Sequence, residues 1–235
     1  MIPIQAAIDE YIASTRKERE PRISMSGLGN CMRKLILTER KAKHFDFDAR
    51  NYRVFAMGFQ VEEFVLKSLR AKGIVFKEQE AVEYRGITGT YDAILRDDES
   101  DALTLIDVKS VHSMKFNYLN KEGVDKNYAM QLWGYQKALE GKYKLSHIPR
   151  IFYVSKDDLR IEDLGVPRSD WGDKVDAKID EIEKWRASDD LPPEKKERDW
   201  ECFVCNKKSG TKAWCRYISN CPVMYKEYQD KGGKQ

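Results

Sequence analysis

The sequence lacks the features of a membrane or secreted protein. No apolar run approaches the roughly 20 residues that a membrane span needs. The first five residues have neither a charged start nor an apolar core, so they do not resemble a signal peptide. The 235 residues include only five cysteines. We therefore expect a cytoplasmic protein whose cysteines are ligands or buried thiols rather than disulfides.

A strong net charge is also missing. The 42 Lys and Arg residues oppose 39 Asp and Glu residues, which leaves +3. The charges nevertheless occur in blocks: residues 31–53, 110–150 and 194–235 each carry a net +4, and residues 157–190 carry −6. Basic blocks that meet on one face would suit a phosphate backbone, although a mixed, solvated surface gives the same counts. Arg33, Lys34 and Lys115 are the candidate DNA-backbone contacts.

The residue pattern predicts helices and strands in an order typical of an α/β fold. Helices are expected over residues 4–19, 31–43, 51–71, 127–139 and 171–186. Strands are expected over 75–84, 88–96, 103–109 and 151–155, with 159–166 pairing with the last of these. We interpret the chain, 1–235, as a single domain: a central mixed β-sheet flanked by helices, with its core at roughly 24–190.

The longest expected helix has apolar residues at helical spacing. These residues are Val54, Met57, Val61, Phe64, Val65 and Leu69, and we expect them to form the face that packs on the core.

Two acidic residues and a lysine lie in apolar strands. In residues 103–109, alternation places Asp107 and Lys109 on one face. Asp92 lies in the preceding strand, and a hairpin through the polar loop 97–101 would bring it beside Asp107. Two adjacent carboxylates repel, and a divalent cation such as Mg²⁺ or Mn²⁺ resolves that conflict. Phosphodiester hydrolysis uses this combination, whereas a surface Asp107–Lys109 ion pair is the alternative.

Residues on two helices could complete this set. Glu62, or its neighbour Glu63, could reach the strand ends as a further ligand, and Gly58 one turn earlier would permit a close approach. Gln131 and Tyr135 are four residues apart and share a helix face, so both can point at a phosphate or at the lysine.

Taken in order, these motifs resemble the PD-(D/E)XK nuclease superfamily. The motifs are Gly58-x3-Glu62, Gly89-Thr-Tyr-Asp92, Asp107-Val-Lys109 and Gln131-x3-Tyr135, and the resemblance spans residues 24–222. It is greatest to RecB-like nuclease domains and the CRISPR-associated exonucleases, and many phages carry similar stand-alone proteins. The resemblance implies that Glu62, Asp92 and Asp107 hold Mg²⁺ or Mn²⁺. It makes Lys109 the catalytic lysine and Gln131 with Tyr135 an auxiliary motif. In the RecB-like branch the Glu62 position is often histidine.

The function implied by this resemblance is hydrolysis of DNA. We expect a metal-dependent deoxyribonuclease, an exonuclease acting on DNA ends, with a helicase, recombination or CRISPR-adaptation partner and no membrane partner. One alternative is a nuclease-fold DNA-binding protein without catalysis. The other is an interaction protein stabilised by zinc.

Four of the five cysteines cluster near the C-terminus. Cys202-x2-Cys205 is followed by Cys215 and Cys221, and these four could make a zinc knuckle that leaves Cys31 unused. The iron–sulfur members of the resembled family suggest a different ligand set. They have one N-terminal cysteine followed by x-Arg, as in Cys31-Met-Arg33, and three cysteines after the nuclease core. The resemblance thus implies an iron–sulfur cluster, of the 4Fe–4S type, held by Cys31, Cys221 and two of Cys202, Cys205 and Cys215. This extension, built from both termini, would join the tail at 194–225 to Cys31.

Overall fold

The computed structural model describes residues 3–15, 20–45, 47–167, 170–194, 203–206, 210–213 and 215–230, without the side chains of 120, 203–206 and 210–213. The chain divides into two compact units. Unit 1 comprises Met1–Arg16, Ser24–Gly29 and Arg50–Lys178, and unit 2 comprises Lys17–Ile23, Asn30–Ala49 and Ile179–Gln235. Cys31 and the cysteine-rich tail therefore belong to the same unit. Among the described helices, none is both long and apolar enough to cross a membrane.

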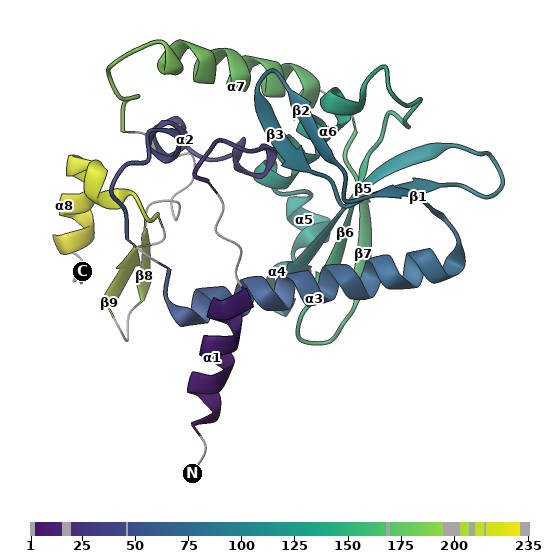
Figure 1. Ribbon diagram of the computed structural model, residues 1–235, viewed down its shortest axis with the longest axis horizontal. Helices are drawn as coiled ribbons and strands as arrows, with labels where there is room; N and C mark the ends of the chain where they lie inside the picture. Colours follow the sequence, from purple (N-terminus) through teal and green to yellow (C-terminus); the bar gives the residue numbers. More distant parts are fainter. Residues whose placement is uncertain are drawn as a thin grey trace. The chain divides into compact units, whose positions relative to one another are not determined.

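Unit 1 is built around a five-stranded mixed sheet with the order β1-β4-β5-β6-β7 (Figure 1). Strands β5 and β6 are parallel, and the other neighbours are antiparallel. The strands are β1 (Val75–Glu78), β4 (Ala93–Arg96), β5 (Leu103–Val111), β6 (Arg150–Ser155) and β7 (Ile161–Gly165). A second sheet pairs β2 (Ala81–Tyr84) with β3 (Ile87–Thr90). The helices are α1 (Ile4–Thr15), η1 (Met25–Gly27), α3 (Ala49–Lys72), α4 (Ser113–Phe116), α5 (Leu119–Glu122), α6 (Lys126–Leu139) and α7 (Trp171–Arg186), the last of which continues into unit 2.

Helices cover both faces of the central sheet. On one face, Val61 and Val65 of α3 belong to the same buried cluster as Ile106 and Val108 of β5. The residues between them in β5 point to the opposite face, where α6 lies, because side chains alternate along a strand. This arrangement confirms the predicted α/β fold with a mixed sheet flanked by helices.

Two of the predicted strands are each divided in two. The strand expected over 75–84 is interrupted after β1, where Gln79 has φ +49°, and β2 joins the second sheet. The strand expected over 88–96 is divided between β3 and β4, and Asp92 lies in the gap. The predicted hairpin forms between β4 and β5, with Ala93 opposite Ile106. The division matters for the site because the backbone of Asp92 lies between the two strands. The Asp92 carboxylate accepts a hydrogen bond from the backbone N–H of Val108.

The predicted apolar face of α3 is only partly correct. Val61 and Val65 are buried, whereas Val54, Met57 and Phe64 are 45%, 54% and 58% exposed. Helical spacing identifies an apolar stripe but not how much of its length the sheet covers.

Unit 2 joins the N-terminal cysteine region to the end of the chain. It contains α2 (Met32–Glu39), η2 (Ile218–Asn220), α8 (Pro222–Asp230) and a hairpin of β8 (Phe203–Asn206) with β9 (Gly210–Ala213). Leu37 of α2 packs with Cys215 and Tyr217. Arg40 donates hydrogen bonds to the carbonyls of Trp185, Ser188, Asp189 and Asp190 at the end of α7. Only Trp185 belongs to the last turn of α7, where helix carbonyls have no partner within the helix, and the other three follow the helix end. The Arg40 cation therefore stabilises the C-terminus of α7 and the segment after it.

Candidate functional site

The acidic residue of β5 is completely buried in unit 1. Asp107 has 0% of its surface exposed, and Lys109 Nζ lies 2.6 Å from its Oδ2. Gln131 Nε2 donates to Asp107 Oδ1 at 3.2 Å. Oδ2 has no hydrogen-bond donor among the described residues apart from this ion pair. A completely buried carboxylate whose Oδ2 is paired with a lysine differs from the predicted alternative of a surface ion pair.

Asp92 lies directly beside Asp107. Its Oδ2 accepts a hydrogen bond of 2.7 Å from the backbone N–H of Val108. Since Ala93 pairs with Ile106, one further step of the β4–β5 register sets Asp92 opposite Asp107. The hairpin therefore brings the two predicted carboxylates together.

Glu62 faces the same site from α3. It is half-buried, and its Oε1 accepts a hydrogen bond of 3.0 Å from Gln79 Nε2. Glu63 is exposed and pairs with Arg70 at 2.8 Å. Of the two glutamates, Glu62 is the one directed toward the aspartates.

Gln131 and Tyr135 point together, as their spacing predicts. Gln131 Nε2 also donates to the Tyr135 hydroxyl at 3.1 Å, and both residues are buried. Asp125 is the N-cap that precedes α6, and its Oδ1 accepts a hydrogen bond of 2.9 Å from the backbone N–H of Asn127. This N-cap fixes the helix that carries the auxiliary pair.

In the absence of a bound cation, the surroundings of the site disfavour the ionised form of its carboxyl groups. Burial, and then the charge of Asp107, raise the pKa of Asp92 well above its ordinary value, although Lys109 opposes this. Burial likewise raises the pKa of Asp107 and of Glu62. Burial alone would lower the pKa of Lys109, but the Asp107 and Asp92 carboxylates outweigh it and raise that pKa. The site thus contains three carboxyl groups whose charge one ammonium only partly compensates.

The donor set fits a hard divalent cation. Mg²⁺ is commonly bound by one or two carboxylates together with water or substrate oxygens, and Asp92 and Asp107 supply two. No three His, Cys, Asp or Glu side chains in the described ranges are already arranged to share a metal. Glu62 in particular is engaged with Gln79. The two aspartates are therefore the primary candidates and Glu62 is the secondary one.

The predicted DNA contacts are engaged within the protein. Lys115 Nζ pairs with Asp125 Oδ2 at 2.9 Å in unit 1, and Lys34 Nζ donates to Asn30 Oδ1 at 3.1 Å in unit 2. Arg33 donates to the carbonyls of Asn220 and Pro192. A phosphate would have to replace these partners, so their contact with DNA stays a prediction.

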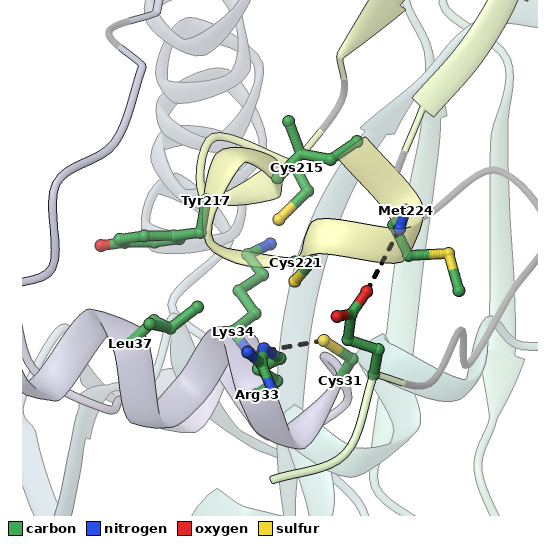
Figure 2. A pocket seen from close by; sticks show the side chains of 10 residues that line it. Cys31, Arg33, Lys34, Leu37, Cys215, Tyr217, Cys221 and Met224 are labelled. Carbon is green, nitrogen blue, oxygen red and sulfur yellow. Dashed lines mark hydrogen bonds between the residues drawn. The ribbon is translucent and has the colours of Figure 1, made fainter. Parts of the chain in front are cut away.

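Three cysteines of unit 2 line one pocket, and Figure 2 shows their side chains facing the same space from α2 and from the C-terminal segment. Cys31 is the N-cap of α2, where its Sγ accepts from the backbone N–H of Lys34 at 3.4 Å. Cys215 is buried and Cys221 is half-buried. Cys202 and the side chain of Cys205 lie outside the described residues. The pocket brings together Cys31 and Cys221, which are 190 positions apart in the sequence.

The pocket offers the sulfur donors of a metal centre. Burial raises the pKa of the Cys221 thiol to about 11, with Arg33 acting in the opposite direction. The cavity has a volume of about 10 Å³, close to the room of one water molecule. The donor type therefore fits zinc or an iron–sulfur cluster, but a cluster would require the lining side chains to move outward.

Sequence reasoning missed Tyr128 and Gln79. The ring centroid of Tyr128 lies 5.2 Å from Lys109 Nζ, and Gln79 binds Glu62. Tyr128 precedes Gln131 by three residues, so the spacing used for Gln131 and Tyr135 could have identified it. Gln79 itself adopts a positive φ in the turn after β1, and the sequence has no clear signal for a turn at this position.

Comparison with known proteins identifies a shared fold. The chain is similar to the solved structure described as "Crystal structure of SSO0001", with a TM-score of 0.53 and 16% identity, covering 94% of this chain and 96% of that chain. It is also similar to an alkaline exonuclease (LHK-Exo) from Laribacter hongkongensis, with a TM-score of 0.47 and 15% identity, covering 75% of this chain and 93% of that chain. No protein-family model and no curated protein matches the chain. At these identities, the first likeness shows a common fold.

Proposed function

We propose that the protein is a metal-dependent deoxyribonuclease. The observation that carries this proposal is the completely buried Asp107, with Oδ2 at 2.6 Å from Lys109 Nζ and Asp92 alongside. Burying two carboxyl groups together is unfavourable unless a cation joins them. A site of this kind contributes little to stability, so a catalytic role accounts for it better.

Asp92 and Asp107 would hold Mg²⁺ or Mn²⁺, with Glu62 as a further ligand. When bound, such an ion lowers the pKa of a coordinated water and neutralises charge on a phosphate. Lys109 donates hydrogen bonds from a group that stays protonated, so it stabilises negative charge that develops on the phosphate. Gln131 orients the Asp107 carboxylate through Oδ1, and Tyr135 holds the Gln131 amide.

The proposed substrate is DNA with free ends, degraded exonucleolytically, with a helicase, recombination or CRISPR-adaptation protein as the partner. The support for this class is the resemblance of the ordered motifs to RecB-like nucleases and CRISPR-associated exonucleases. The proposed contacts to the DNA backbone are Arg33, Lys34 and Lys115, each of which would exchange its partner within the protein for a phosphate group.

We also propose that the cysteine pocket of unit 2 holds an iron–sulfur cluster. Cys31, Cys215 and Cys221 would supply three ligands, and Cys202 or Cys205 the fourth. A zinc knuckle built from the four tail cysteines does not require Cys31 as a ligand. The presence of Cys31 in one pocket with Cys215 and Cys221 therefore favours the cluster. When bound, the metal centre would tie α2 to the C-terminal segment of unit 2.

The experiment combines end-labelled DNA with a matched pair of variants. Full-length protein is incubated with linear single-stranded, linear double-stranded and closed circular DNA, in Mg²⁺, in Mn²⁺ and in chelator. We expect cation-dependent loss of the linear substrates and none of the circles. Asp107→Asn keeps the shape of the side chain and should abolish turnover. Asp163→Asn, which alters an exposed pair with Arg150, should not.

The outcomes separate the alternatives. Lys109→Met removes a donor that stabilises charge on the phosphate, so it should lower turnover by about 10²- to 10³-fold. A protein that binds DNA but cuts none with any cation would be a nuclease-fold binding protein instead. A protein that neither binds nor cuts DNA and contains zinc would be an interaction protein.

A further inference from the structure

Tyr128 is an aromatic residue of the candidate site to which the proposed function gives no role. It is half-buried on α6, one turn before Gln131. Lys109 Nζ and Lys115 Nζ each lie 5.2 Å from the centroid of its ring, within the range of a cation–π interaction. One ring therefore attracts two ammonium groups.

A second aromatic ring, that of Tyr153 on β6, restrains the position of the Tyr128 ring. Its centroid lies 6.2 Å from that of Tyr153, with the two ring planes tilted by 51°. Tyr153 is completely buried on β6, and it pairs in parallel register with Lys109 of β5. The residue that supports the ring is thus the strand neighbour of the lysine that the ring contacts.

Lys109 needs an anchor that does not depend on Asp107. In the structure its ammonium group lies 2.6 Å from Asp107 Oδ2, the carboxylate that the proposed function gives to a divalent cation. Positive charges repel, so this ion pair weakens when a cation is bound. The face of an aromatic ring attracts an ammonium group without competing for the carboxylate.

We propose that Tyr128 is a positioning residue, whose ring keeps Lys109 directed at the substrate phosphate while the aspartates hold a cation. This inference rests on the proposed function, because a positioned lysine matters only where a phosphodiester is attacked. The ring also restrains Lys115, whose carboxylate partner is Asp125 at 2.9 Å.

The first test measures the contact without turnover. The protein is labelled with ¹³C-lysine, kept in chelator, and the Lys109 ε-methylene signal is identified as the one absent from Lys109→Arg. Ring currents should shift this signal upfield. Tyr128→Leu should move it to the range of ordinary lysines, and Tyr128→Phe should leave it in place. Tyr118→Leu, at a tyrosine that is 49% exposed, is the matched control and should also leave it in place. A Lys109 signal that stays unchanged in Tyr128→Leu would overturn the contact.

The second test separates kcat from KM. Tyr128→Leu should lower kcat by about 5- to 30-fold, the factor expected from loss of a desolvated cation–π contact. Its KM should change little. Tyr128→Phe should restore kcat to near the wild-type value. If Tyr128→Leu does not fold, a ring-fluorinated phenylalanine at position 128 keeps the ring size and weakens the attraction of its face. The kcat value should then fall as fluorine atoms are added.

The two proposals fail in different ways. Wild-type protein that cuts no DNA would refute the nuclease function, while the lysine signal would still report on the Tyr128 contact. A wild type that cuts DNA, together with an unchanged kcat in Tyr128→Leu and in the fluorinated series, would refute the positioning role alone.

Discussion

Gly89 of β3 offers a sharp test of how the fold supports the site. A Cβ atom at this position would lie 2.6 Å from Tyr135 Cε1 and 2.8 Å from Met25 Cγ. Neither neighbour can swing into solvent, because Tyr135 is 2% exposed and Met25 is 0% exposed. The Gly89→Ala substitution must therefore displace the Tyr135 ring, Met25 or the strand itself.

The expected cost can be estimated from these contacts. Overpacking of a filled core costs about 1–3 kcal/mol, and the reduced entropy of the unfolded chain offsets about 0.4–1 kcal/mol of this. We expect Gly89→Ala to be destabilised by about 1–2 kcal/mol, which lowers Tm by about 2–8 °C for a domain of this size. Displacement of Tyr135 also disturbs its hydrogen bond with Gln131, so turnover should fall along with stability.

Gly58→Ala is the matched control. Gly58 lies in the interior of α3, and the nearest atom to a Cβ there is Ser110 Oγ at 3.6 Å, an ordinary contact. The structure therefore does not need a glycine at position 58 for the close approach that the sequence suggested. Alanine is a better helix former than glycine by up to about 1 kcal/mol, so this variant should be more stable.

The assay is urea unfolding of both variants beside the wild type, followed by DNA turnover of the folded proteins. We expect opposite signs for the same chemical change at the two positions. Equal shifts, or a Gly89→Ala variant as stable as the wild type, would refute the packing argument.

Three further predictions concern DNA binding and unit 2. Affinity for DNA should fall linearly with salt on logarithmic axes, with a slope near −0.9 for each phosphate contact on duplex DNA, and a flat titration would exclude backbone recognition. Anaerobically purified protein should be brown and contain iron and sulfide, and Cys31→Ser should bleach it; a colourless wild type containing zinc would contradict the cluster. Arg33→Met removes charged hydrogen bonds to Asn220 and Pro192, so the metal-free protein should lose about 1.5–3 kcal/mol of stability, whereas the exposed Arg50→Met should change it little.

The alternation of side chains in β5 was enough to predict much of the candidate site. It placed Asp107 and Lys109 on one face, and the polar loop after β4 correctly indicated the hairpin that brings Asp92 to them. Helical spacing likewise predicted that Gln131 and Tyr135 point together. These features depend on local periodicity, which a sequence displays directly.

Features that depend on tertiary packing were not predictable in the same way. The interruption of the strand at Gln79 places a non-glycine residue at positive φ, for which the sequence gives no signal. The exposed Met57 and Phe64 of α3 follow an apolar pattern that would equally well suit a core. The meeting of Cys31 with Cys215 and Cys221 was expected only from a family resemblance, because the local spacing of the tail cysteines equally allowed a zinc knuckle.

The discontinuous composition of unit 2 has a consequence for biosynthesis. Cys31 and Cys215 are 184 positions apart in the sequence, so at about 5–20 residues per second Cys31 is synthesised roughly 10–40 s before Cys215. All segments of unit 1 have been synthesised by Lys178, and this unit can therefore fold while α2 still lacks its C-terminal neighbours. During that interval Cys31 lacks the C-terminal residues that line its pocket in the finished fold, so we expect its thiol to be open to oxidants and chaperones. Production of intact protein should therefore depend on the redox state of the cell during translation as well as on the stability of the finished fold.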